Sequence, residues 1–167
     1  MELFFNIIHY CLYKADSKRH LLSNKLNPFV FIGKIPAVKK KFEEQGTSLL
    51  GVTNKVWGDK RYGFSIMISG GALVVSLSFL IWGITTTTAS LFDIYFYVKP
   101  VHVIVYGVTS YAICHFTVFK GDKYLRYFKR FEKWSKADKW KYSLLTFAFV
   151  VGSIFFWLYS FRFLPIT

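Results

Sequence analysis

Three long stretches without a single charged side chain constrain what this chain can fold into. They cover residues 62–92, 100–119 and 142–161. A helix needs about 20 mainly apolar residues to cross the roughly 30 Å hydrocarbon core of a bilayer, and each stretch reaches that length. Buried helices of soluble proteins rarely do, and a chain of 167 residues could hardly cover three of them. The sequence therefore predicts an all-α integral membrane protein with three transmembrane helices.

Flanking residues set the limits of the predicted spans, which cover about 63–84, 98–119 and 140–164. Residues 85–90 are rich in threonine and serine, and we interpret them as the polar exit from the first span. The segment Ser135–Asp138 has the form of a capping box just before an apolar run, which predicts the start of the third helix there.

The chain divides into a basic N-terminal region, residues 1–61, and a membrane domain, residues 62–167. The apolar segment 3–13 is too short to cross a bilayer, and its helical spacing predicts a helix that lies in the membrane interface or packs against the spans. Two prolines bracket residues 29–33, which favours a short extended or turn segment. A further short helix is predicted from Pro36 to about Gln45, because proline is well tolerated at a first helical position.

Basic residues are distributed very unevenly along the chain. The net charge is +13, with 22 Lys and Arg against nine Asp and Glu; eleven of the basic residues precede the first span and nine lie between the second and third. Only one separates the first span from the second, and one follows the third. The positive-inside rule then places the N-terminus and the loop 120–139 in the cytoplasm, with the C-terminus outside. The expected location is an inner or plasma membrane.

The basic loop also interleaves aromatic residues at helical spacing, which predicts an amphipathic helix. Its candidate contact residues are Lys123, Arg126, Lys129, Arg130 and Lys133. Each cation near an anionic leaflet contributes about 1 kcal/mol of attraction, so the loop is a candidate site for anionic headgroups or a cytosolic partner. The alternative is that it only fixes the topology. A nucleic-acid role is disfavoured, because the aromatics are expected to seat the helix in the interface.

Small residues in the first and third spans are candidates for helix contacts. They are Ser69, Gly70, Gly71, Ala72 and Ser76 in the first span, with Ala148 and Gly152 in the third. Small side chains let two helix backbones approach closely where lipid supplies no hydrophobic driving force between helices. The contact could be within the chain, with another copy or with a different protein.

Four ionisable residues lie in or beside the second span and could line a pore mouth or a polar path: Asp93, Lys99, His102 and His115. The two histidines are almost four helical turns apart, roughly 20 Å, so one continuous helix could not bring both to one metal ion. Neutral, hydrogen-bonded structural roles are favoured for them. The sequence contains no HExxH, GxSxG or P-loop motif and no GxGxxG after a strand. We expect no enzymatic activity, cofactor or metal.

Three functional hypotheses remain. The preferred one is a small non-enzymatic membrane subunit that assembles with itself or with larger partners, and whose basic cytoplasmic surface contacts anionic lipid or a cytosolic protein. The second is a homo-oligomeric channel or pore-forming effector. The third is a membrane enzyme acting on a lipid, with His102 or His115 as acid or base.

Overall fold

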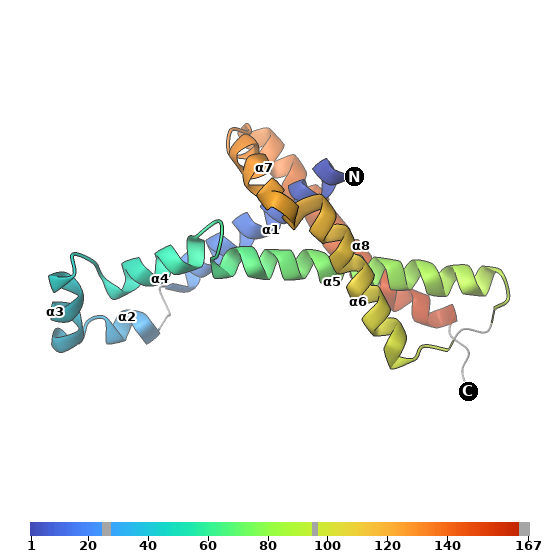
Figure 1. Ribbon diagram of the computed structural model, residues 1–167, viewed down its shortest axis with the longest axis horizontal. Helices are drawn as coiled ribbons and strands as arrows, with labels where there is room; N and C mark the ends of the chain where they lie inside the picture. The colour runs from blue at the N-terminus through green and yellow to red at the C-terminus, as the bar shows by residue number, and fades with distance from the viewer. Residues whose placement is uncertain (25–27, 95–96, 164–167) are drawn as a thin grey trace. The chain divides into compact units, whose positions relative to one another are not determined.

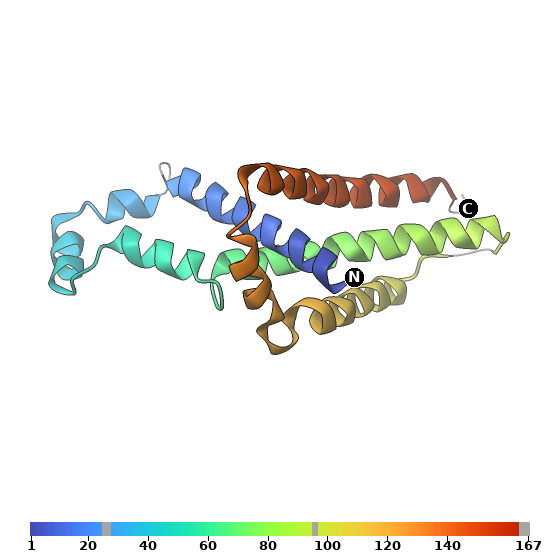
Figure 2. The ribbon, with the colours of Figure 1, turned by 90° about the horizontal axis from the view of Figure 1, so that it is seen from above.

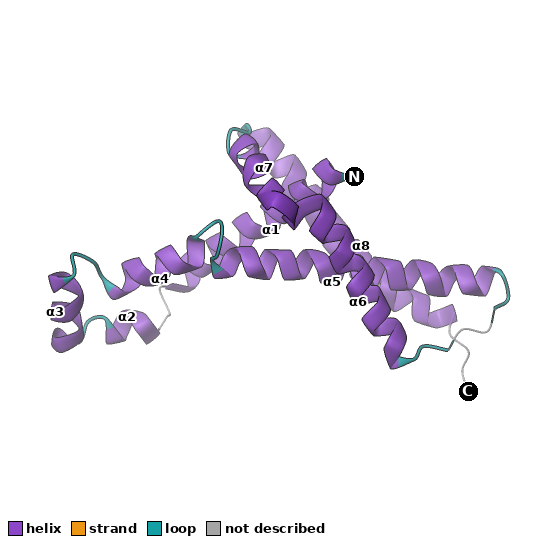
Figure 3. Cartoon of the chain, viewed as in Figure 1, coloured by secondary structure: helices purple, strands orange, loops and turns teal. Residues whose placement is uncertain are grey.

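The computed structural model describes residues 1–24, 28–94 and 97–163, and within them all regular structure is helical (Figure 3). Three helical segments in this part of the chain are long and apolar enough to cross a membrane. They contain α5 (Phe64–Leu91), α6 (Pro100–Cys114) and α8 (Lys136–Ser160) (Figure 1). The predicted helical class and the three apolar helices are thereby confirmed.

The ends of these helices follow the sequence signals in part. Helix α6 begins at Pro100, and α8 begins after Ser135, whose Oγ accepts a hydrogen bond from the Asp138 amide at 3.1 Å. Helix α5 continues through residues 85–90, where the polar exit from the first span is predicted. Thr85 donates its hydroxyl proton to the Ile81 carbonyl at 2.8 Å, so this polar side chain is satisfied without ending the helix. Leu164, the predicted end of the third span, lies outside the described residues.

The second span ends in a sharp change of backbone direction. Helix α6 is followed by a π-helical turn, η2 (His115–Phe119), then by η3 (Lys120–Asp122) and α7 (Lys123–Phe131). Gly121 and Asp122 have φ values of 67° and 52°, in the left-handed region that favours glycine and tolerates aspartate. The basic segment therefore forms a helix separate from the span.

The chain forms two compact units, which are described separately. The first contains residues 1–11 and the chain from Gly70 onward, and the second contains Leu12–Ser69. Helix α1 (Glu2–Ser23) contributes to both, as does α5. The helix predicted at 3–13 is thus the first half of a longer one.

In the first unit, the later part of α5 lies between α6 and α8 (Figure 2). The Phe79 and Trp157 rings stack with centroids 4.4 Å apart, and the Trp82 and Tyr106 ring centroids are 5.8 Å apart. Gly83 faces α8, because a Cβ built there would lie 2.6 Å from Cδ1 of Phe156. The apolar helices therefore pack through aromatic rings, and Gly83 leaves room for the Phe156 ring beside α5.

Helix α8 buries small polar residues seven positions apart, namely Thr146, Ser153 and Ser160. Each hydroxyl donates to a carbonyl of its own helix at 2.7–2.8 Å. The buried hydroxyls are thereby satisfied within α8, and their small size leaves room for neighbouring rings.

The second unit contains α2 (Pro28–Ile32), α3 (Pro36–Glu44) and α4 (Leu49–Gly58). Helix α3 agrees with the prediction. The extended or turn conformation predicted for 29–33 is wrong for most of the segment, because α2 continues to Ile32 and only Gly33 lies in a turn. Proline pre-sets a helical φ at a first position, and the Phe31 and Ile32 carbonyls accept from the Lys34 and Ile35 amides at 3.0 and 3.1 Å, which closes the following turn.

Candidate functional site

Helix α7 has one aromatic face, and that face is buried in the protein. Tyr124, Phe128 and Phe131 are at most 6% exposed. The Tyr10 ring of α1 lies 5.1 Å from the Phe128 ring and 5.5 Å from the Phe131 ring, centroid to centroid. The expectation that these aromatics seat the helix in the membrane interface is therefore wrong, because α1 covers them.

The opposite face of α7 and the turn after it carry the cations. Arg126, Lys129, Arg130 and Lys133 are all exposed, and residues three or four apart share one side of a helix. Lys123 differs, because its Nζ lies 3.0 Å from Glu2 Oε2 and donates to the Phe116 carbonyl at 3.0 Å. Four of the five predicted contact residues thus remain available to a ligand, while Lys123 has a structural partner.

Glu2 connects the beginning of α1 to α7. Besides its ion pair with Lys123, its Oε1 accepts a hydrogen bond from the Tyr127 hydroxyl at 3.2 Å. The hydrogen bond from Lys123 lowers the pKa of Glu2, the bond from Tyr127 lowers it further, and desolvation works in the opposite direction. The ionised carboxylate is therefore the form that holds the two helices together.

This arrangement predicts an acid-sensitive contribution to stability. Because the pKa of Glu2 is depressed in the folded state, its contribution is present above the ordinary value of 4.5 and is lost as the pH falls through the lowered pKa. The wild type should unfold at a higher temperature than Glu2→Gln at pH 7. This difference in unfolding temperature should disappear as the pH falls below 4.5. Glu43→Gln, which removes an exposed pair with Lys39 at 3.6 Å, is the control and should leave the unfolding temperature nearly unchanged. A gap for Glu2→Gln that is independent of pH would contradict the assignment.

Two fully buried polar residues of α1 lie behind α7. Asn6 donates to the Thr117 carbonyl at 3.0 Å and to the Glu2 carbonyl at 2.8 Å. Thr117 belongs to the π-helical turn, and such turns disturb the regular helical hydrogen-bond ladder.

The second of these residues, His9, is 0% exposed. The centroid of its ring lies within 5.4–5.6 Å of the centroids of the Phe119, Tyr124 and Phe128 rings. Sequence reasoning missed both residues, although polar side chains within the apolar segment 3–13 were a usable signal.

The predicted helix-contact residues divide into two groups. Ser69, Gly70 and Ser76 are buried, and a Cβ at Gly70 would lie 3.2 Å from Phe119 Cζ. Gly71 is exposed and Ala72 is half-buried. In α8, Ala148 and Gly152 are also exposed, with nothing within 4 Å of a Cβ built at Gly152. The structure therefore uses part of the predicted surface internally and leaves the rest open.

The four ionisable residues near the second span do not form one site. His102 Nδ1 accepts from the Lys99 amide at 2.9 Å, which caps the start of α6. His115 is half-buried beside the Tyr111 and Phe116 rings. Asp93 is exposed at φ 53°. Among the described residues, no three His, Cys, Asp or Glu side chains are grouped as metal ligands would be.

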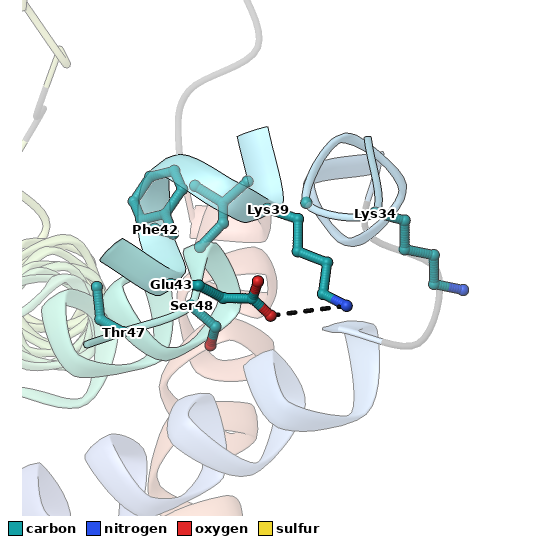
Figure 4. A pocket seen from close by; sticks show the side chains of 8 residues that line it. Lys34, Lys39, Phe42, Glu43, Thr47 and Ser48 are labelled. Atoms are coloured by element: carbon teal, nitrogen blue, oxygen red, sulfur yellow. Dashed lines mark ion pairs between the residues drawn. The ribbon is translucent and has the colours of Figure 1, made fainter. Parts of the chain in front are cut away.

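A pocket of about 310 Å³ lies where the turn between α2 and α3 meets the start of α4. Lys39 Nζ lies 3.6 Å from Glu43 Oε1 in this pocket, while the Lys34 side chain extends away from both (Figure 4). Ser48 caps α4 and its Oγ already accepts from the Gly51 amide at 3.0 Å. Both side chains of this ion pair are 62% exposed, so it is a weak surface pair, and the pocket alone does not select an anion.

No known protein family, curated protein or solved structure matches the chain.

Proposed function

We propose that this protein is a non-enzymatic, multi-pass subunit of an inner or plasma membrane that binds anionic lipid headgroups through the exposed face of α7. The observation that carries the proposal is the burial of the α7 aromatic face against α1, with Arg126, Lys129, Arg130 and Lys133 facing outward. Packing of the buried aromatic face holds the α7 backbone that carries these cations in place before lipid binds, which lowers the entropic cost of binding.

The proposed orientation places the N-terminus and α7 in the cytoplasm and the C-terminus outside. Twenty of the 22 basic residues precede the first span or lie between the second and third, and such residues concentrate on the cytoplasmic side of membrane proteins. The cytoplasmic leaflet carries most anionic lipid, so this orientation brings the α7 cations to their proposed ligand.

Thiol labelling in intact cells tests this orientation. Phe92→Cys should react with a membrane-impermeant maleimide added outside, because the loop after α5 is proposed to be external. Lys133→Cys should react only after the membrane is permeabilised. The natural thiols, Cys11 and Cys114, are buried, so the wild type supplies the background. Labelling of Lys133→Cys from outside intact cells would contradict the proposed topology and indicate the opposite orientation.

Removing the four α7 cations should weaken retention of anionic lipid. At about 1 kcal/mol for each cation near an anionic surface, the four sum to about 4 kcal/mol. Arg126, Lys129, Arg130 and Lys133 are replaced together by glutamine, and binding of fluorescent phosphatidylglycerol to the full chain in mild detergent is measured. We expect the affinity to fall by up to about a thousandfold relative to the wild type, the factor to which about 4 kcal/mol corresponds.

The matched control exchanges lysine and arginine at the same four positions, which preserves the charge and should preserve binding. Fluorescent phosphatidylcholine should bind the wild type and both variants equally weakly. Equal phosphatidylglycerol binding by the wild type and the glutamine variant would contradict the proposal. Loss of a copurifying acidic protein with unchanged lipid binding would identify a cytosolic protein as the ligand instead.

Assembly with another copy or a larger partner is the second part of the proposal. Ser69, Gly70 and Ser76 are already buried inside the chain, so the open small residues Gly71 and Gly152 are the ones proposed for contacts with a neighbour. Small residues at such positions allow close approach of helices in lipid.

A further inference from the structure

The short helices of the second unit expose large apolar side chains outside the three spans. Phe31 is 63% exposed, Ile32 42% and Ile35 48%. Val52 and Val56 of α4 are exposed as well, and α2 and α4 lie side by side (Figure 1). Lipid around the spans does not account for this exposure, because these residues belong to other helices.

The same segment is rich in lysine. Lys34, Lys39, Lys40 and Lys41 are exposed, and the neighbouring acids are Glu43 and Glu44. Apolar side chains placed beside several cations are typical of segments that lie in the interface of an anionic membrane. The charge therefore favours a negatively charged surface over a neutral one as the covering partner.

Chain connectivity limits how far α4 can lie from the start of the first span. Only residues 59–63 join Gly58, the end of α4, to Phe64, the first residue of α5. Six residue steps can extend at most about 20 Å. The linker is folded rather than extended, because the Arg61 and Tyr62 amides both donate to Asp59 Oδ1 at 2.7 Å. If α5 crosses a bilayer and begins at its surface, the Gly58 end of α4 lies within about 20 Å of that surface.

We propose that Phe31, Ile32 and Ile35 insert into the interface of an anionic bilayer, with Lys34 and Lys39–Lys41 against its headgroup phosphates. This surface, defined by these seven residues, is called the α2–α3 surface below. The inference rests on the membrane insertion of α5 and is independent of lipid binding by α7.

Spin labels on the full chain test the inference. Nitroxides are attached at Phe31→Cys or Ile35→Cys, with Cys11 and Cys114 replaced by alanine, in nanodiscs of phosphatidylglycerol and phosphatidylcholine. Relative accessibility to oxygen and to a nickel chelate measures the depth of each label. Both labels should lie about 5–10 Å into the boundary between headgroups and acyl chains. Gln45→Cys, at the exposed end of α3, is the matched aqueous control.

A label at Leu144→Cys on α8 reports insertion of the spans and separates the two possible failures. Aqueous labels at positions 31 and 35 with a lipid-exposed label at 144 would overturn the inference alone, whereas an aqueous label at 144 would overturn the membrane proposal. Dipolar broadening between labels on different molecules would show that a second copy covers the surface, which also overturns the inference.

Replacing the four lysines of the α2–α3 surface by glutamine tests the role of charge. The labels at positions 31 and 35 should move toward water in the anionic nanodiscs. An unchanged depth would overturn the contact assigned to the lysines.

Discussion

Replacing Gly83 by leucine is expected to destabilise the protein by about 3 kcal/mol, because overpacking a closely fitted contact forces side chains or backbone to move. A Cβ at this position would lie 2.6 Å from Cδ1 and 2.7 Å from Cε1 of Phe156, well inside van der Waals contact. Leucine adds three further carbons beyond that Cβ. The measurement is unfolding of the purified chain in mild detergent, followed by the loss of helical circular dichroism.

Gly71→Leu is the matched control on the same helix. No heavy atom lies within 4 Å of a Cβ built at Gly71, so stability should change by no more than about 0.5 kcal/mol. A smaller complex in mild detergent with unchanged stability would support assembly through this face. Phe156→Ala in the Gly83→Leu background should recover part of the lost stability, since the two residues are coupled. Equal losses in the two glycine variants would contradict the packing argument.

Gly83 and Gly71 lie on the same helix but differ in what surrounds them, and this difference shows how much of the packing could be predicted from the sequence. Long uncharged runs indicated three apolar helices because lipid requires length and apolarity. They could not indicate which side of each helix contacts protein, since lipid and a helix interior are similarly apolar. Neighbouring residues on a helix point about 100° apart, so Gly70 approaches Phe119 while Gly71 is open. Ser69, Ser76 and Gly83 are spaced seven residues apart, and all three are buried. This spacing indicates the side of α5 that contacts protein better than the run of small residues at 69–72 does.

The candidate site was predictable to a similar extent. The spacing of lysine, arginine and aromatic residues after the second span correctly predicted a basic amphipathic helix. It could not predict what covers the aromatic face, because a membrane interface and a packed aromatic helix favour the same side chains. The ion pair between Glu2 and Lys123 joins residues far apart in the chain. Local patterns carry no information about such a contact, so the structural role of Lys123 could not be foreseen.

Asp16→Leu is the second change with a large expected effect, at about 3 kcal/mol, because it removes a buried charged acceptor and leaves its donors unsatisfied. The Asp16 side chain is 8% exposed. It accepts hydrogen bonds from the Ser65 hydroxyl at 2.9 Å and the Trp57 indole at 3.3 Å, and from Arg19 at 2.6 Å. Ser65 is fully buried, so water cannot replace the lost acceptor. Hydrogen exchange of the α4 and early α5 amides measures the effect.

Arg19→Leu separates the buried hydrogen bonds from the surface ion pair. The Arg19 side chain is 69% exposed, so its pair with Asp16 is screened by solvent and should contribute less than about 1 kcal/mol. Equal effects of the two substitutions would show that Asp16 acts through the ion pair. Trp57 and Ser65 lie on opposite sides of the 59–63 linker, so Asp16 holds α4 beside the first turn of α5. Asp16→Leu should therefore also increase the mobility of a nitroxide at Phe31→Cys, because α2 packs against α4.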